Sequence, residues 1–172
     1  MTRDHTVTDS EASTGYRTST RTLRYVAAAL AYVVALLHLF HPTLGTTAFV
    51  AYTLAGTPLV DPRPTAFVLS GVAIIVGANL VLLGLPRRPI YLAGMVLMVV
   101  HLTGYFGWHT FGHGAWWPLL DRPAHSHTLG EILLGPHHLR GDALALGSKL
   151  SELGLLLVLA VLYRRESKPG RQ

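Results

Sequence analysis

The feature of this sequence that most limits its fold is a series of four long apolar segments. A helix needs roughly 20 mostly apolar residues to cross the hydrocarbon core of a bilayer. Backbone N–H and C=O groups find no water there, so a spanning segment must satisfy them internally, as a helix does. Four segments qualify, namely residues 23–41, 65–85, 90–110 and 143–163. We therefore predict an all-α integral membrane protein whose transmembrane domain, residues 23–163, is a four-helix bundle.

The fourth segment has the weakest start of the four. The stretch from Leu150 to Tyr163 is too short to cross a bilayer alone. The helix must therefore extend back through Lys149 towards Asp142. The carboxylate of Asp142 has the right chemistry to cap the N-terminus of a helix at that point.

The composition supports a membrane protein and excludes several kinds of site. Only 13% of the residues are charged, whereas about a quarter are charged in a typical soluble domain. The chain has no cysteine, which excludes disulfides, zinc–thiolate sites, iron–sulfur clusters and thiol nucleophiles. The net charge of +5 comes mostly from residues beside the apolar segments and forms no basic helix face, so we expect no nucleic-acid partner.

The distribution of Lys and Arg predicts the orientation in the membrane, because cytoplasmic loops carry an excess of these residues. Ten of the fourteen lie in the N-terminal segment, the turn between the second and third spans, or the C-terminal tail. We therefore place both termini in the cytoplasm, and a longer, histidine-rich loop between the third and fourth spans outside. The expected location is the cell membrane, with the lipid bilayer as partner and a homo-oligomer or a membrane partner subunit as further partners.

The segments outside the spans have distinct compositions. Residues 1–22 are rich in Thr and Ser and predict a disordered cytoplasmic tail, and residues 164–172 form a basic cytoplasmic tail. A cleaved signal peptide with residues 26–39 as its core is an alternative, but the polar leader and the three later spans favour a retained anchor. Residues 44–55 predict a short interfacial helix, and the prolines at 58, 62 and 64 are expected to break regular structure before the second span.

Histidine is the residue type that points to a function. Imidazole is the commonest protein ligand for metals and titrates near neutral pH. The chain has ten histidines, and nine fall in or beyond the outer half of the predicted membrane. These nine are His38, His41, His101, His109, His113, His125, His127, His137 and His138. Their accumulation on one side indicates a site on that side, although it specifies no reaction.

The spacing of the histidines predicts which rings meet. His101, Tyr105, His109 and His113 recur every four residues, so they share one helix face if the helix persists. The pair His109 and His113 has the spacing of helical zinc motifs, although nearby glycines weaken the helix there. His38 and His41 are three residues apart and also share a face.

The expected depth of each residue in the membrane shows which further side chains can lie at the same level. With a rise of about 1.5 Å per residue, His101 lies roughly 16 Å from the inner end of its span and Glu152 roughly 13 Å from the outer end of its own. The two can therefore lie at a similar depth. Ionisable groups at such depths are costly unless paired, and mark functional sites by default. Lys149 and Glu152 are three residues apart and form a predicted buried polar pair that can neutralise itself.

These observations predict a site that binds a transition metal or haem in the outer half of the bundle. We expect His38, His101 and His109 to bind the cofactor, and the metal ligands to come from His38, His41, His101, His109 and His113. Zinc, copper, iron and haem b are the candidates, and soft copper(I) is disfavoured because cysteine is absent and methionine is rare. Asp121, Glu131 and Asp142 are further candidate carboxylates. On this hypothesis His101→Ala and His109→Ala would each remove most of the bound metal.

Three other functions remain open at this point. The first is a proton or ion pathway, or a pH sensor, that uses His101 and Glu152. The second is a structural or accessory membrane subunit with incidental histidines. The third is an enzyme, which the sequence disfavours, because the HExxH zinc-peptidase motif and repeated HxxHH boxes are absent.

Overall fold

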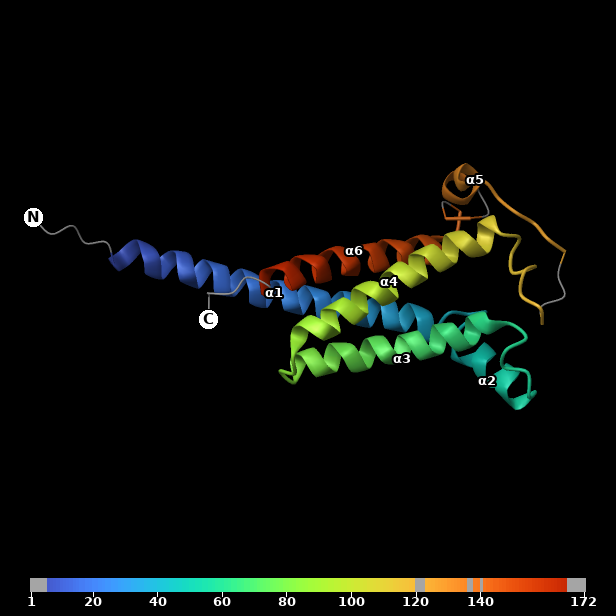
Figure 1. The fold of residues 1–172 in the computed structure, drawn as a ribbon, viewed down its shortest axis with the longest axis horizontal. Helices are drawn as coiled ribbons and strands as arrows, with labels where there is room; N and C mark the ends of the chain where they lie inside the picture. Colours follow the sequence, from blue (N-terminus) through green and yellow to red (C-terminus); the bar gives the residue numbers. More distant parts are fainter. Residues whose placement is uncertain (1–5, 120–122, 136–137, 140, 167–172) are drawn as a thin grey trace, which may run out of the picture.

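The structure is a computed structural model that describes residues 6–119, 123–135, 138–139 and 141–166, with side chains from residue 20 onwards. Over these residues it is all-helical and contains no strand. The helices are α1 (Thr6–Leu39), α2 (Thr46–Leu54), α3 (Pro62–Leu82), α4 (Arg87–Thr110), α5 (Leu129–Leu134) and α6 (Ala143–Glu166) (Figure 1). The predicted all-α class is confirmed.

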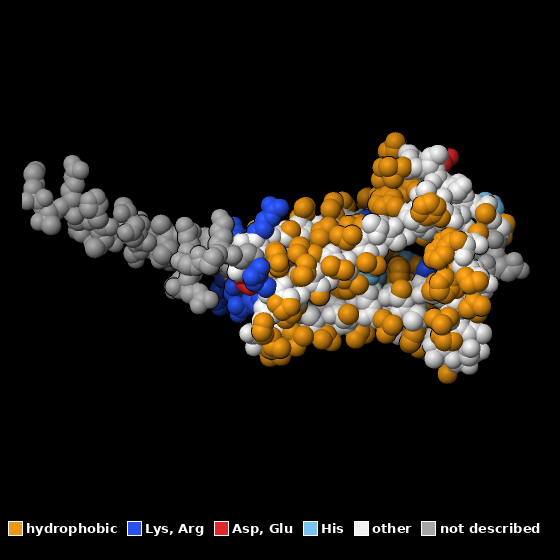
Figure 2. Space-filling view, in the orientation of Figure 1, with side chains coloured by type: hydrophobic (Ala, Val, Ile, Leu, Met, Phe, Trp, Pro, Cys, Tyr) orange, Lys and Arg blue, Asp and Glu red, His pale blue; other side chains and the backbone are white. Residues whose placement is uncertain are grey.

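Four helical segments are long and apolar enough to cross a membrane. They are Thr20–Leu39 of α1, Pro62–Leu82, Arg87–Thr110 and Ala143–Glu166. Between 11% and 28% of the residues in each are buried inside the protein, so most of their apolar side chains face outwards (Figure 2). A soluble monomer does not expose so much contiguous apolar surface. The chain is therefore a multi-pass membrane protein.

The bundle is held by three extensive helix contacts, and a fourth contact is slight. α1 packs against both α3 and α6, and α6 packs against α4, whereas α3 and α4 touch less. Gly71 permits the close approach of α1 and α3, because a Cβ atom there would lie 2.8 Å from Cγ of Leu39. The core between the helices includes Val34, Ile74 and Met98.

The N-terminal end of α1 and the C-terminal end of α6 lie at one end of the bundle, and α2 and α5 lie at the other (Figure 1). Lys and Arg side chains gather at the first of these ends (Figure 2). An ion pair of 2.8 Å between Arg24 and Glu166 joins the first span to the last there. We call this the basic end and the opposite one the histidine end. The assignment of the basic end to the cytoplasm stays a prediction.

Two helix starts differ from the sequence-based expectation. α1 already begins at Thr6, within the segment expected to be a disordered tail. Residues 6–39 contain no proline, so the helix of the span can propagate towards the N-terminus. α3 begins at Pro62, where prolines were expected to break the chain. The first turn of a helix tolerates proline because its N–H groups need no helical partner, and Asp61 caps it by accepting from the N–H of Arg63 at 3.1 Å.

The start of the fourth span agrees with the sequence. α6 begins at Ala143, and the carboxylate of Asp142 accepts hydrogen bonds from the N–H groups of Leu144 at 2.9 Å and Ala145 at 3.1 Å. This is the N-cap that the sequence predicted. The cap fixes the register of α6, and with it the depth of Lys149 and Glu152 in the membrane.

Candidate metal centre

Three ligating side chains from three different helices meet inside the bundle. They are His38 from α1, His101 from α4 and Glu152 from α6, and one ligand atom of each lies within 4.8 Å of the others. His38 and Glu152 are 1% and 0% exposed. We call this group the inner site. The depth argument from the sequence, which placed His101 and Glu152 at a similar level, agrees with this contact.

The hydrogen bonds of His38 leave one ring nitrogen ready to bind a cation. Nδ1 donates to the carbonyl oxygen of Val34 at 2.7 Å. Nε2 of a neutral ring is then an acceptor. It lies 3.6 Å from Oε1 of Glu152 and is buried with no hydrogen-bond partner among the described residues. Nε2 of His38 and Oε1 of Glu152 are thus two acceptor atoms side by side, an arrangement that a shared cation satisfies.

His101 contributes a second unpartnered nitrogen. Its Nδ1 atom is also buried without a hydrogen bond. The ring stacks on that of His38, with centroids 4.5 Å apart and an angle of 27° between the planes. Buried polar atoms in proteins almost always find a partner. Two orphaned imidazole nitrogens beside one carboxylate therefore fit the donor set of a metal ion.

Glu152 is held by two neighbours on its own helix. The ammonium group of Lys149 lies 2.7 Å from both carboxylate oxygens, and the hydroxyl of Ser148 donates to Oε1 at 2.9 Å. Lys149 also lies 5.1 Å from the centre of the Tyr105 ring. The predicted buried pair is present in the structure, and it balances the charge of the carboxylate in the absence of a metal.

A second group of imidazoles lies further towards the histidine end. It consists of His109, His113, His127 and His138, and we call it the outer cluster. Nδ1 of His109 and Nε2 of His113 are 2.9 Å apart. The ring of His127 is 5.0 Å from that of His113 and 4.3 Å from that of His138, and the rings of His109 and His138 are 5.1 Å apart. Imidazoles from α4 and from two separate loop segments thus converge.

The end of α4 explains how His113 reaches His109. α4 ends at Thr110, and His113 adopts a positive φ of 54° between two glycines that also have positive φ. A left-handed residue is uncommon outside glycine and often marks a functional site. Gly114 is required here, because a Cβ atom would lie 2.2 Å from the Trp108 ring. The turn therefore preserves the contact that helical spacing predicted, although the helix itself has ended.

A cavity of about 470 Å³ connects the two groups of histidines. His38 and His101 line it at one level and His109 and His138 at the other, together with Lys149. Figure 2 shows the molecule hollowed near the histidine end, with His and Lys or Arg atoms visible there. The two groups of histidines therefore border one continuous space.

One predicted metal ligand, His41, lies outside both groups of histidines. His41 lines the cavity but belongs to neither group; its Nδ1 accepts from the N–H groups of Thr43 at 3.3 Å and Leu44 at 3.2 Å. Burial lowers the pKa of His41, and Arg63 and Lys149 act in the same direction, whereas Asp142 opposes them.

Two of the three candidate carboxylates, Glu131 and Asp142, lie in the described part of the chain, and neither belongs to the inner site there. Glu131 forms a capping box with Thr128 at the start of α5, and hydrogen bonds from the backbone and side chain of Thr128 lower its pKa. Asp142 caps α6 and lines the cavity. Asp121, like His137, lies outside the described residues.

Sequence reasoning grouped the ligands incompletely. It expected His38, His101 and His109 to bind one cofactor, and all three line one cavity, but His109 lies about two helical turns, or about 12 Å, along α4 from His101 and belongs to the outer cluster. It also treated Glu152 as a charge partner and not as a ligand. His127 and His138 belong to HxH and HH pairs that are visible in the sequence, but only the path of the loop brings them to His109.

The inner site fits a metal ion better than haem. Two axial histidines of a haem point their nitrogens at the iron from opposite faces of the porphyrin. The rings of His38 and His101 instead lie face to face at 4.5 Å, which leaves no room for a porphyrin between them. The inner site thus offers two nitrogen donors and one carboxylate that could hold a metal ion. No protein-family model, no curated protein and no solved structure matches this chain.

Proposed function

We propose that this protein binds a divalent transition-metal ion within the cell membrane, at His38, His101 and Glu152. The observation that carries the proposal is the meeting of two imidazoles and a buried carboxylate, with one ligand atom of each within 4.8 Å of the others. Among the described residues, each of the two rings also has one buried nitrogen with no hydrogen-bond partner. Each ligand comes from a different helix, so a bound ion would also tie α1, α4 and α6 together.

The donor set favours particular metals. Imidazole suits zinc, copper, iron and nickel, and two histidines with one carboxylate and open positions are typical of non-haem Fe²⁺. Zinc also binds to three such ligands with a water as the fourth. We therefore propose Zn²⁺ or Fe²⁺ as the occupant, with its open coordination positions facing the cavity.

The outer cluster supplies the entry route in this proposal. His109 and His138 line the histidine end of the cavity, His113 and His127 contact them, and neutral imidazole is a common metal ligand. An ion captured there would pass Tyr105 and Lys149 on its way to Glu152. On the predicted orientation this end faces outside, so the ion would come from the extracytoplasmic side.

Lys149 is the main obstacle to metal binding. Its ammonium group contacts both oxygens of Glu152, and a divalent cation on the same carboxylate would repel it. Lys149 lines the cavity, so its flexible stem can swing the charge away from Glu152. We propose that Lys149 occupies the carboxylate when no metal is bound and leaves when one arrives.

The same contact favours a second candidate, a proton or ion pathway that uses His101 and Glu152. Chains of intramembrane acid and histidine groups are typical of proton-coupled transport. Here the Lys149–Glu152 pair and the two stacked imidazoles lie at the inner end of a cavity lined by further histidines. Such a pathway would operate without any stoichiometric metal.

Metal analysis of the purified protein separates these candidates. We expect about one Zn²⁺ or Fe²⁺ to bind tightly to the wild type, and His101→Ala or Glu152→Gln to lower the affinity at least tenfold, because ligand loss removes a direct bond. His5→Ala is the control and should bind as the wild type does. Equal metal content in all four proteins would overturn the proposal. A metal-free wild type that moves protons in vesicles would favour the pathway, and one that purifies with a partner subunit would favour an accessory role.

A further inference from the structure

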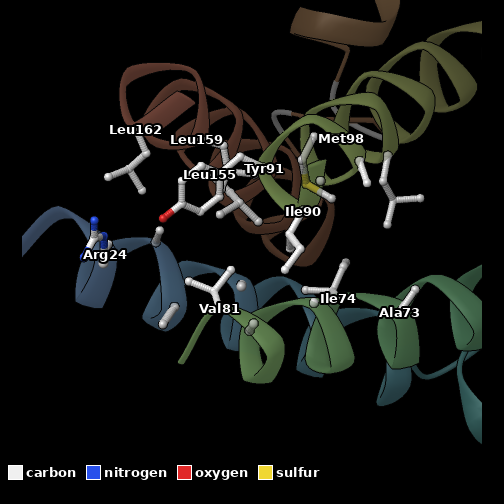
Figure 3. Close-up of a pocket in the computed structure, with 18 residues that line it drawn as sticks. Arg24, Ala73, Ile74, Val81, Ile90, Tyr91, Met98, Leu155, Leu159 and Leu162 are labelled. Atoms are coloured by element: carbon white, nitrogen blue, oxygen red, sulfur yellow. The ribbon is translucent and has the colours of Figure 1, made fainter. Parts of the chain in front are cut away.

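An apolar groove lies in the half of the bundle nearer the basic end, where α3 and α4 pack least closely. It has a volume of about 160 Å³ and is lined by α1, α3, α4 and α6 (Figure 3). Small residues on three helices create it, namely Ala28, Ala31, Ala73, Gly77, Ala93 and Gly94. We call it the apolar groove, and it shares no residue with the cavity at the histidine end.

The groove ends at the polar side chains of Arg24 and Tyr91, which belong to its lining. The oxygen of Tyr91 points towards Arg24 in Figure 3, and the two side chains interact. Arg87 lies one helical turn before Tyr91 on α4, on the same face, although it does not line the groove. Within the described part of the chain, Nε of Arg24 and Nε of Arg87 are buried without a hydrogen bond. Two guanidinium donors near Tyr91 therefore lack an acceptor.

The charge around these donors is positive. Arg24, Arg87 and Arg88 lie at this end, and Glu166 offsets one of them through its ion pair with Arg24. Arg88 lies over the ring of Tyr163 on α6, so its charge also belongs to this region. An anionic group with several acceptor oxygens, such as a phosphate diester, complements both the charge and the missing hydrogen bonds.

We propose that the apolar groove binds one anionic phospholipid. Its phosphate would accept from Arg24, Arg87 and Tyr91, and one hydrocarbon chain would lie between α3 and α4. Basic pockets between transmembrane helices are known to take lipid head groups. The groove opens between helices whose exposed Val76 and Leu92 already face lipid. A cavity of about 150 Å³ accepts a molecule such as benzene, so 160 Å³ suits a slender chain and excludes a helix about 10 Å wide.

This proposal is independent of the metal site, and native mass spectrometry tests it. The purified protein would be exchanged into mixed micelles that hold equal amounts of phosphatidylglycerol and phosphatidylcholine. We expect one phosphatidylglycerol to be retained per chain and little phosphatidylcholine. Arg87→Gln should weaken retention about tenfold, because it removes a charge-assisted hydrogen bond. Gly77→Leu should abolish retention by filling the groove, since a Cβ atom at Gly77 has only Ile90 within 4 Å, at 3.7 Å.

Gly147→Leu is the matched control for the groove-filling variant. Gly147 lies on α6, and a Cβ atom there meets nothing within 4 Å, so this variant should retain lipid as the wild type does. Thermal unfolding of each variant checks that the fold is intact. Equal retention of the two lipids, or undiminished retention in folded Gly77→Leu, would overturn the proposal. It would also be overturned if inorganic phosphate bound equally well to the wild type and Gly77→Leu. A wild type that is a lipid-free dimer, and that becomes a monomer in Gly77→Leu, would overturn it as well.

Discussion

The rings of His38 and His101 stack at a centroid distance of 4.5 Å between the first and third spans. Each ring keeps one nitrogen without a partner, Nε2 in His38 and Nδ1 in His101. An ordinary structural stack would place both nitrogens on hydrogen-bond partners, because an unsatisfied buried polar group costs about 1–3 kcal/mol. The stack therefore leaves one unpartnered nitrogen on each ring among the described residues, and that of His38 lies 3.6 Å from Oε1 of Glu152.

Replacing His101 by Phe separates the packing of this ring from its role as a ligand. His101→Phe keeps an aromatic ring against His38, so we expect the metal-free protein to lose less than about 1.5 kcal/mol of stability. Metal affinity should nevertheless fall at least tenfold, as in His101→Ala. Unfolding of the metal-free protein and equilibrium metal titration measure the two effects. Unchanged affinity in His101→Phe would show that the imidazole is not a ligand.

The Lys149–Glu152 pair should dominate the stability of the metal-free protein. Glu152→Gln leaves the buried ammonium of Lys149 without its counter-charge, and breaking a buried pair in this way costs about 3–5 kcal/mol. The double variant Lys149→Met with Glu152→Met leaves no charge and should lose less than Glu152→Gln alone. Chemical unfolding in detergent gives both values. A cost below about 1 kcal/mol for Glu152→Gln would mean that Lys149 is already hydrated through the cavity.

Removing Lys149 alone should strengthen metal binding. In Lys149→Met no ammonium group competes with the ion for the two oxygens of Glu152, so we expect the affinity to rise about tenfold or more, in line with the strength of charged hydrogen bonds. Isothermal titration with Zn²⁺ measures the change. Weaker binding in Lys149→Met would show that the lysine helps to build the site.

The outer cluster should control the rate of metal uptake more than the final occupancy. His113→Ala removes the partner of His109 in the outer cluster, while His38, His101 and Glu152 keep their positions. We therefore expect slower filling of the inner site from dilute metal, with an unchanged equilibrium affinity there. Stopped-flow measurements with a metal indicator give the rate, and His125→Ala, which changes an exposed ring, is the control. If His113→Ala abolishes binding at the inner site, the two groups act as one.

His41 should make the protein less stable in mild acid. Burial lowers its folded pKa below the ordinary histidine value of 6.5, so the unfolded chain binds the proton more readily. This contribution to stability is complete above about pH 6.5 and is lost as the pH falls from there towards the folded pKa. Asp142 opposes the shift, and Arg63 and Lys149 reinforce it. The unfolding free energy measured from pH 7.5 to 5 should fall less steeply in His41→Gln than in the wild type.

Much of the architecture follows from properties that are local in the sequence. Hydropathy identified the four spans, and Asp142 marked the start of the fourth through a cap that needs only its own next residues. Depth also came from counting along each helix, which is why His101 and Glu152 were expected at one level. The prediction that Pro62 and Pro64 break regular structure before the second span was wrong, because proline breaks a helix interior but not its first turn.

The tertiary structure decided which side chains face one another. The rotation of each helix about its axis depends on contacts with other helices, such as the fit of Gly71 against Leu39, and no single segment encodes it. That rotation turns His38 and His101 towards Glu152 and leaves His109 to the outer cluster. The path of the loop, which adds His127 and His138, likewise depends on distant partners. The sequence by itself determined how many helices are long and apolar enough to cross a membrane and which polar groups lie at similar levels along them, and packing determined that the histidines meet in two groups.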